Sequence, residues 1–435
     1  MLLQDGYLTI CADLDSCAVY MILIITYITS MIVVYMIPNS YIEKNAITSL
    51  ERIERHGLYP RIAVTALSTL DHFTDKIMLE TSLQQTGHAL NDAMIPSYYR
   101  YWHGYQVFLR PLLCIMSEPL MWCLFVIIFI FLFYKVFIKI KEKTNIDCSI
   151  AFLFSFAMTY PYVAPFSLQY VNVYAITLIT IISICSKRNI PLYILFFIAG
   201  SLINFMDLLT FPIISLGFPL TVVLVMQMRE QSYSLKDGVS TVVISSTMWG
   251  LGYAGTWISK WVLSYVILGH ETFATILSSC MFRMAGGSVE DPLSYYQVFQ
   301  DNLLILLLVT PEVWVAIGIT ALIVMHVRHV QLKAKFINFW LKIKQTKDKA
   351  IPLGLVAATP VCWYLVLANH SQIHEHFTFR ITTVSIFAGL MLTDYAISQD
   401  PQKLSLLNTL TTKYYHLTQS KKIIIGILIL IFLLI

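Results

Sequence analysis

Long apolar runs recur along this 435-residue chain and are separated by shorter polar segments. Several runs extend over about 18 residues or more with hardly a charge, which is enough for a helix to cross a hydrocarbon core of ~30 Å. They lack the strict alternation of barrel strands, so backbone hydrogen bonds inside lipid would have to form within helices. We predict helical spans at 17–37, 119–138, 149–164, 168–185, 190–208, 209–226, 239–256, 311–327, 350–368, 381–398 and 423–435.

This pattern predicts an all-α polytopic membrane protein, with about 10–11 transmembrane helices in a single integral membrane domain over residues 1–435. The composition agrees, because 57% of the residues are hydrophobic and 12% are charged. A soluble domain usually carries about twice that charged fraction. The eight cysteines form no C-x-x-C pair, so the sequence indicates neither a disulfide framework nor a zinc site.

Lysine and arginine are distributed unevenly between the two sets of loops. By the predicted spans, nineteen of the 29 lie on one side, which the positive-inside rule assigns to the cytoplasm. The amino terminus is then cytoplasmic, and 38–118, 257–310 and 369–380 face outward from a bacterial plasma membrane. The outer side holds eight of the eleven histidines, and most of its cations are arginines. Any chemistry is therefore expected on the outer face.

The first outer segment, 38–118, is too long for a simple hairpin and is predicted to be partly helical. Ser40 and Glu43 form an S-x-x-E capping box ahead of apolar residues at helical spacing, and Gly57 follows as a terminator. An amphipathic helix is therefore predicted along the outer surface. Further helical patches are predicted at STLDHFTDKIML and SYYRYWHGYQVFLRPLL, and 257–310 forms a second extracytoplasmic segment.

Asp71 and Asp75 are the candidate catalytic residues. They are four residues apart, so in a helix they would share one face. One of them could act as a general base toward a hydroxyl, or the pair could hold a divalent metal. The alternative is a solvated helix face or a helix cap.

The aromatic segment SYYRYWHGYQVFLRPLL supplies the first candidate substrate-binding residues. Aromatic faces stack on sugar rings, and arginine can hold a lipid-borne phosphate. The alternative is an aromatic belt at the membrane interface, although a belt requires neither arginine nor histidine. The candidates are Arg100, Tyr101, Trp102, His103 and Arg110.

A second group of candidates comes from the stretch ANHSQIHEHFTFR. Arg380 stands at the start of a predicted span and is placed to meet an anionic headgroup, while His370 and His374 could transfer protons or bind sugar hydroxyls. The histidine spacing was weighed as a zinc site, but no HExxH motif or nearby cysteine supports it, and no metal ligands are assigned. Asp207, at the exit of a span, is either a functional acid or a turn residue.

The layout resembles the GT-C superfold of glycosyltransferases, with many spans and a long first outer loop that carries amphipathic helices. That resemblance implies an isoprenoid-phosphate sugar as donor and an outer-loop carboxylate as base, a role that would fall to Asp71 or Asp75. The family usually has an acid soon after the first span, where this chain has only Glu43. The stretches DHFTD, YYRYWHGY and HSQIHEHFTFR are also similar to uncharacterised bacterial polytopic membrane proteins.

The sequence therefore predicts a membrane glycosyltransferase of the cell envelope. It would move a sugar from a polyprenyl-phosphate donor to a glycan or glycolipid acceptor at the outer face, among membrane lipids and without nucleic acid. A divalent cation is the one cofactor that the residues leave open. The alternative function is a transporter, flippase or polymerase of lipid-linked glycans, and a transporter would line a midplane cavity with polar or broken-helix positions.

Overall fold

The computed structural model describes residues 2–63, 65–95, 97–186, 190–269, 271–286, 292–305 and 346–398. Within these ranges the chain is helical, apart from turns and one isolated β-bridge between Arg61 and Thr69. The all-α prediction is therefore confirmed for the described residues. The spans predicted at 311–327 and 423–435 lie outside them.

Four helices of the described chain are long and apolar enough to cross a membrane. They are α1 (Leu2–Tyr35, from Ser16 onward), α6 (Glu118–Lys143), α8 (Leu168–Cys185) and α17 (Lys347–Val366). Three further apolar helices are shorter: α7 (Ile146–Ala157), α9 (Leu192–Met206) and α10 (Ile214–Gln227). The long α11 (Leu235–Leu268) and α20 (Thr383–Ser398) complete the bundle.

Helix α11 is longer than the pattern predicts. The predicted span ends at 256, but the helix continues to Leu268 and has 34 residues, or about 51 Å at 1.5 Å per residue. The extension carries the polar Lys260 and Ser264, which interrupt the apolar run. Both are buried against the first loop, where Lys260 donates to the carbonyl of Met94 at 2.8 Å and Ser264 to that of Tyr99 at 3.2 Å.

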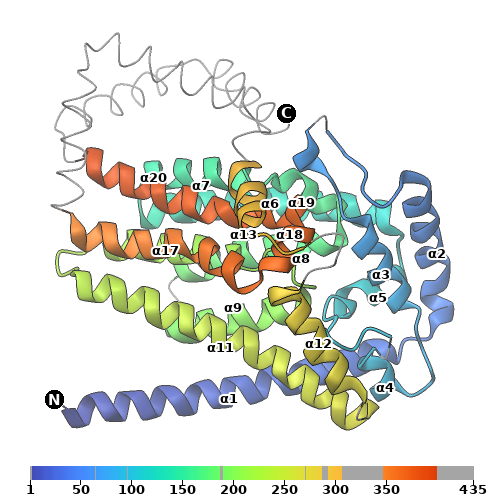
Figure 1. Cartoon of the computed structure of the whole chain (residues 1–435). Coiled ribbons are helices and arrows are strands. Elements are labelled where there is room, and N and C mark those ends of the chain that lie inside the picture. The colour runs from blue at the N-terminus through green and yellow to red at the C-terminus, as the bar shows by residue number, and fades with distance from the viewer. Residues whose placement is uncertain are drawn as a thin grey trace.

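The segments predicted to face outward gather at one end of the bundle (Figure 1). The first loop contributes α2 (Asn39–His56), α3 (His72–Ser82), α4 (Ala89–Ala93) and α5 (Gln106–Leu113). Beside it lie α12 (Glu271–Ala285) and α18 (Ala368–Ile373). The start of α1 and the end of α20 lie at the other end. We call the end that holds α2–α5, α12 and α18 the loop end.

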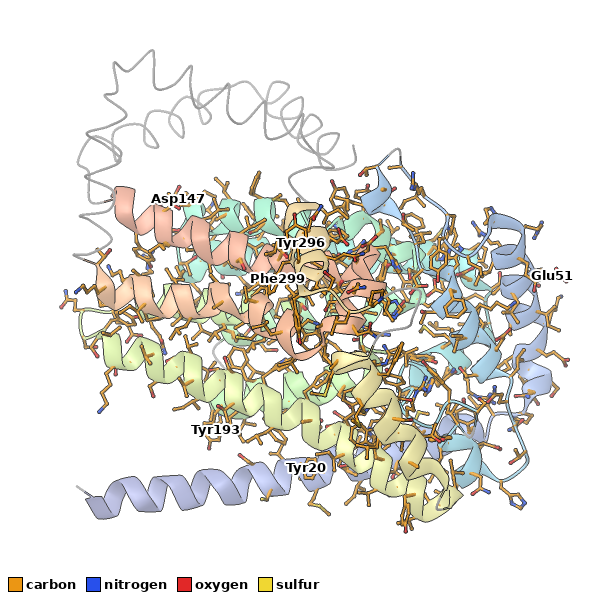
Figure 2. The ribbon with its side chains drawn as sticks, in the orientation of Figure 1. Tyr20, Glu51, Asp147, Tyr193, Tyr296 and Phe299 are labelled. Carbon is orange, nitrogen blue, oxygen red and sulfur yellow. The ribbon has the colours of Figure 1, made fainter. Side chains whose placement is uncertain are left out.

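The amphipathic helix predicted after the first span is α2. It buries Ile42, Ala46 and Ile53 and presents Glu51 on its outer side (Figure 2). Gly57 ends it with φ 86°, as predicted. The prediction of a capping box formed by Ser40 and Glu43 is wrong, because the helix begins at Asn39 after Pro38 and no side chain caps it.

Two glycines bring α9 and α11 into close contact. A Cβ on Gly200 would lie 2.0 Å from the carbonyl oxygen of Trp249, and one on Gly252 would lie 2.1 Å from that of Phe197. Small residues at such crossings let two helix backbones approach within van der Waals distance. Helices α9 and α11 therefore pack closely against each other.

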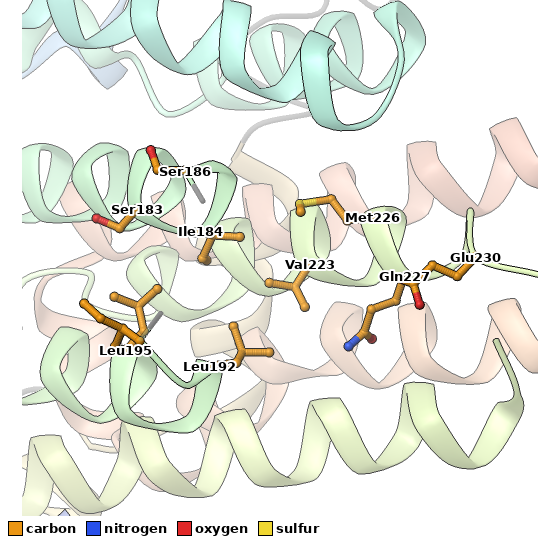
Figure 3. Close-up of a pocket in the computed structure, with 10 residues that line it drawn as sticks. Ser183, Ile184, Ser186, Leu192, Leu195, Val223, Met226, Gln227 and Glu230 are labelled. Carbon is orange, nitrogen blue, oxygen red and sulfur yellow. The ribbon is translucent and has the colours of Figure 1, made fainter. Parts of the chain in front are cut away.

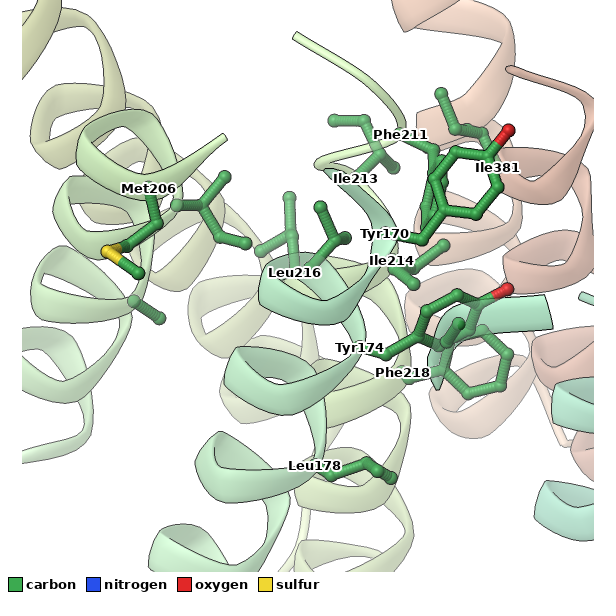
Figure 4. Close-up of a cluster of buried hydrophobic side chains, with 14 of the residues drawn as sticks. Tyr170, Tyr174, Leu178, Met206, Phe211, Ile213, Ile214, Leu216, Phe218 and Ile381 are labelled. Atoms are coloured by element: carbon green, nitrogen blue, oxygen red, sulfur yellow. The ribbon is translucent and has the colours of Figure 1, made fainter. Parts of the chain in front are cut away.

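An aromatic core fills the space between α8 and α10 (Figure 4). Tyr174 packs edge-on against Phe211 with ring centroids 5.3 Å apart, and Phe218 stacks on Phe387 of α20 at 5.4 Å. Tyr170 lies one turn before Tyr174 and reaches the loop end, also in contact with Phe211. The aromatic core therefore extends through Tyr170 to the polar residues of the loop end.

Candidate functional site

The two candidate catalytic carboxylates take different roles at the start of α3. Asp71 is the N-cap of that helix and accepts hydrogen bonds from the backbone N–H of Thr74 at 3.1 Å and from its hydroxyl at 2.8 Å. Burial raises the pKa of the Asp71 carboxyl, and the two bonds from Thr74 lower it. Capping, weighed as an alternative from the sequence, is thus one role of Asp71.

Asp75 lies inside α3 and bonds it to the start of α8. Its Oδ1 accepts from the backbone N–H of Gln169 at 2.9 Å and from the hydroxyl of Ser167 at 3.2 Å. The side chain is fully buried, and burial together with the nearby Glu118 raises the pKa of Asp75 well above its ordinary value. A solvated helix face is therefore not the environment of either aspartate.

A cluster of His72, Asp75 and Glu118 lies between α3 and the start of α6. All three side chains are buried, and one ligand atom from each lies within 4.8 Å of the other two. Oδ2 of Asp75 makes no hydrogen bond with the described residues, whereas the His72 ring lies beside the backbone of Gly57 and Phe166 and the Glu118 carboxylate beside Trp122. A buried polar group without a partner costs about 1–3 kcal/mol. These three residues are the set that could hold a metal ion.

Three histidines form a row across the loop end, on α18, on α19 (Glu375–Thr378) and at the junction between the two helices. The ring centroids of His370 and His374 are 4.6 Å apart, and those of His374 and His376 are 6.0 Å apart. At one end of the row, Arg283 of α12 lies 2.6 Å from Nδ1 of His370. At the other end, the His376 ring meets Tyr59 edge-on at 5.5 Å. We call His370, His374 and His376 the histidine row.

The histidine row is held in the neutral form. Burial lowers the pKa of His374 to about 3 and that of His376 to about 4, with the charges of Arg283 and Arg380 acting in the same direction. Burial likewise holds the pKa of His370 well below its ordinary value. Neutral imidazoles can accept a proton or a hydrogen bond from a bound hydroxyl, so the row retains the capacity predicted from its sequence.

Arg380 is enclosed rather than open to a headgroup. Its guanidinium donates to the carbonyls of Thr159 at 2.9 Å, His376 at 3.0 Å and Leu67 at 3.3 Å, and it is fully buried. It also lies 4.8 Å from the ring centroid of Tyr170. A phosphate would reach this arginine only after the surrounding segments had moved.

Tyr170 and Tyr59 connect Arg380 to the first loop. Tyr170 is close enough to Arg380 and to both aspartates for the charges of all three to act on its hydroxyl. On the surface, Tyr59 stacks on Phe73 with centroids 6.5 Å apart, and the charge of Asp71 acts on its hydroxyl as well. Both rings of this surface pair are exposed.

The inner part of the aromatic segment packs into the bundle. Trp102 donates to the carbonyl of Thr256 at 2.6 Å, and His103 bonds through one ring nitrogen to Tyr105 and through the other to the carbonyl of Tyr98. Both side chains are buried, and burial lowers the pKa of His103 to about 3. These residues do not form an exposed aromatic belt.

Arg110 is likewise enclosed, at the end of α1. It donates to the carbonyls of Val34 at 2.9 Å and of Ile37 and Ser82, and it also contacts the Asn39 amide oxygen. Its side chain thus joins the end of α1 to the end of α3. The structure does not bring Arg110 to the other candidates.

Arg100 and Tyr101 line a small pocket between α11 and α12. Arg100 donates to the hydroxyl of Ser279 at 3.0 Å, and the guanidinium of Arg283 lies 5.8 Å from the ring centroid of Tyr101. The pocket holds about 10 Å³ and is also lined by Trp257 and Trp261. Two arginines therefore lie around one tyrosine, and Arg283 continues into the histidine row.

Asp207 closes a turn at the end of α9. It accepts from the backbone N–H of Thr210 at 2.8 Å and from its hydroxyl at 2.6 Å. The turn positions the carbonyl of Leu209, which lies 2.6 Å from Nε2 of His370. Asp207 is therefore a turn residue, which is one of the two interpretations from the sequence. The turn that it closes positions the Leu209 carbonyl beside the histidine row.

The structure connects some of the residues selected from the sequence with others that were not selected as site residues: His72, Glu118, Arg283, Tyr59 and His376. The selected residues in this region are Asp71, Asp75, Arg100, Tyr101, His370, His374 and Arg380. His72 stands three residues before Asp75, a spacing that puts both on one helix face. This spacing could have identified His72 from the sequence. Glu118, Arg283 and Tyr59 carry no local signal, because only tertiary packing brings them to the loop end.

A larger cavity lies at the opposite end of α8 (Figure 3). It holds about 210 Å³, and its polar lining consists of Ser183, Ser186, Gln227 and Glu230. It therefore does not coincide with the predicted site residues. Comparison with protein-family models, with curated proteins and with solved structures finds no match to this chain.

Proposed function

We propose that the chain is a multi-pass glycosyltransferase of a bacterial plasma membrane, with its amino terminus in the cytoplasm and its loop end outside. Four apolar helices of spanning length and three shorter apolar ones support insertion into a bilayer. In this proposal the shorter helices and the apolar part of α11 also cross, which gives eight spans among the described residues, and the other spans expected from the sequence are α20 and the runs at 311–327 and 423–435. The first loop then lies at the outer surface.

One observation carries the proposed activity: a continuous row of contacts leads from Arg283 through the histidine row to Tyr59. Arginines at one end suit the phosphate of a donor, and the exposed rings of Tyr59 and Phe73 at the other suit a sugar face. Asp71 adjoins that aromatic pair and is our choice for the general base. The neutral histidines between the two ends would bind hydroxyl groups.

The surface of α12 supports an isoprenoid chain on the donor. Leu277, Met281 and Met284 are exposed on that helix, whereas Ser279 and Arg283 turn toward Arg100. An apolar helix face next to two arginines matches a ligand with an apolar tail and an anionic head. The glycan or glycolipid acceptor would approach from the side of Tyr59.

The test is transfer of a radiolabelled sugar from an isoprenoid-phosphate donor by the purified full-length chain in lipid vesicles. Asp71→Asn should lower the rate by about 100-fold to 10,000-fold, as expected for a removed base. Glu51→Gln, on the exposed side of α2, serves as the matched control and should retain the activity of the unmodified chain.

Two outcomes would overturn the proposal. Full activity of the Asp71→Asn variant would show that Asp71 is not the general base. Failure of the unmodified chain to use any such donor, together with movement of a lipid-linked glycan across the vesicle membrane, would instead identify the transporter. The lining of the 210 Å³ cavity at the far end of α8 would then be the first place to mutate.

A further inference from the structure

We propose that His72, Asp75 and Glu118 bind a divalent transition-metal ion that joins α3 of the first loop to the start of α6. The three side chains are 2% exposed or less, and their ligand atoms lie within 4.8 Å of one another. The metal site does not depend on glycosyl transfer, because the ligands are defined by burial and geometry alone.

An unpartnered carboxylate oxygen points to a ligand at this position. Oδ2 of Asp75 is shielded from solvent and makes no hydrogen bond with the described residues, whereas the His72 ring lies beside the backbone of Gly57 and Phe166 and the Glu118 carboxylate beside Trp122. Most buried polar atoms in proteins have a partner, so a fully buried carboxylate oxygen without one, facing a histidine and a second carboxylate, requires an explanation. One bound cation would serve an atom of each residue at once.

The surroundings of Asp75 match those of a metal ligand. Ser167 and the backbone N–H of Gln169 both bond to Oδ1, which leaves Oδ2 directed into the cluster. Metal-ligating carboxylates are commonly oriented by such outer hydrogen bonds. His72 and Asp75 are three residues apart on one helix, and a pair at that spacing is also used in carboxylate-bridged metal centres.

The ligand chemistry selects the class of ion. One imidazole nitrogen and two carboxylates suit Zn²⁺ or Mn²⁺, whereas Mg²⁺ and Ca²⁺ prefer oxygen alone. Two carboxylates balance the charge of a divalent ion, and Arg52, stacked on Trp122 at 3.8 Å, lies close enough to Glu118 to act on its charge. At bond lengths of ~2.0–2.2 Å, tetrahedral ligands lie roughly 3.4 Å apart, so binding would shorten any ligand-atom separation that is close to the 4.8 Å limit.

Metal content is the direct test. Full-length protein would be stripped with a chelator, loaded with Zn²⁺ or Mn²⁺ and freed of excess metal, and its bound metal would be measured by mass spectrometry. The unmodified chain should retain a near-stoichiometric amount, and Glu118→Gln and His72→Gln should lose it. Ser167→Ala should weaken binding about 10-fold to 100-fold, as for other outer-shell changes.

Asp92→Asn is the matched control. Asp92 is a buried carboxylate of the same loop, but its Oδ1 bonds to the backbone N–H and the hydroxyl of Thr86, and it lies outside the cluster. This variant should bind metal like the unmodified chain. Bound metal should also raise the unfolding temperature of the unmodified chain and of Asp92→Asn, but not that of Glu118→Gln.

Two results would overturn the metal site. One is equal metal content in the unmodified chain and Glu118→Gln, which would place any bound ion elsewhere. The other is failure of the unmodified chain to retain either metal; a higher unfolding temperature for Glu118→Gln would then indicate that the cluster shares protons instead. Because Ser167→Ala keeps all three ligands, it remains informative if a ligand variant fails to fold.

Discussion

Arg283 donates a hydrogen bond to Nδ1 of His370 across 2.6 Å, although both side chains are basic. The opposite nitrogen, Nε2, faces the carbonyl of Leu209 at 2.6 Å and must donate to it. The imidazole therefore carries its single proton on Nε2 and is neutral. An arginine thus fixes the tautomer of the first member of the histidine row.

Acidification should destabilise the protein through the histidine row. The unfolded chain protonates His376 below a pKa of ~6.5, whereas the folded chain does so only near pH 4. Stability contributed by the neutral ring is therefore present at neutral pH and lost as pH falls from about 6.5 toward 4. Between pH 7.5 and 5.0 the unmodified chain should lose about 2 kcal/mol more than His376→Gln.

Thermal unfolding of both proteins at the two pH values measures this difference. Asp71 and Asp75 have raised pKa values and therefore favour the folded state as pH falls, with the opposite sign. They are present in both proteins, so their effect cancels in the comparison. Parallel pH dependence of the two proteins would contradict a buried neutral His376.

Arg380 should act mainly on stability. Arg380→Ala leaves the carbonyls of Thr159, His376 and Leu67 without their donor, and hydrogen bonds to a charged group contribute about 1.5–3 kcal/mol each. We expect a loss of at least about 3 kcal/mol, seen as a lower unfolding temperature in detergent, with little rescue by Arg380→Lys. Arg55→Ala, on the exposed side of α2, is the control. An unchanged unfolding temperature combined with a raised KM for donor would favour phosphate binding instead.

The helix cap and the proposed base role of Asp71 can be separated. Asparagine caps a helix about as well as aspartate, so Asp71→Asn should change stability by only a few tenths of a kcal/mol, whereas Asp71→Ala should cost about 1 kcal/mol. Chemical denaturation of the two variants measures the cap. If Asp71→Asn were as destabilised as Asp71→Ala, its loss of activity could not be assigned to chemistry.

The orientation in the membrane can be tested with single cysteines. In a chain whose native cysteines have been replaced, Glu51→Cys and Tyr296→Cys should react with an impermeant thiol reagent in intact cells. Leu235→Cys, at the start of α11, should react only after permeabilisation. All three positions are exposed in the structure. Labelling of Leu235→Cys in intact cells would reverse the proposed topology.

The four helices of spanning length were predictable because the length of an apolar run is itself the physical requirement for crossing lipid. The runs at 149–164, 190–208 and 209–226 were predicted as spans too, but they form the shorter helices α7, α9 and α10. The continuation of α11 past residue 256 was not predictable, since Lys260 reads as a polar loop residue until the carbonyl of Met94 is placed beside it. The candidate site was likewise predictable only in part. The spacing of Asp71 and Asp75 identified the right helix, but the partner of Asp75 in the metal cluster, Glu118, begins a helix that is distant in sequence.

The arginines show a further limit of sequence reasoning. Outward arginines suggested phosphate ligands, yet Arg110 and Arg380 are occupied by backbone carbonyls of other segments. A carbonyl has no sequence signature, because every residue carries one. Arg100 and Arg283, in contrast, line a pocket. Only the packing of α12 distinguishes these two arginines from Arg110 and Arg380.

The bond from Arg380 to the carbonyl of Leu67 joins positions separated by 313 residues. A ribosome delivers the first loop long before Arg380, so the loop emerges before its anchor exists. During that interval Leu67 and Thr159 lack the cation that joins them. Chains interrupted before residue 380 would therefore carry a first loop without this anchor.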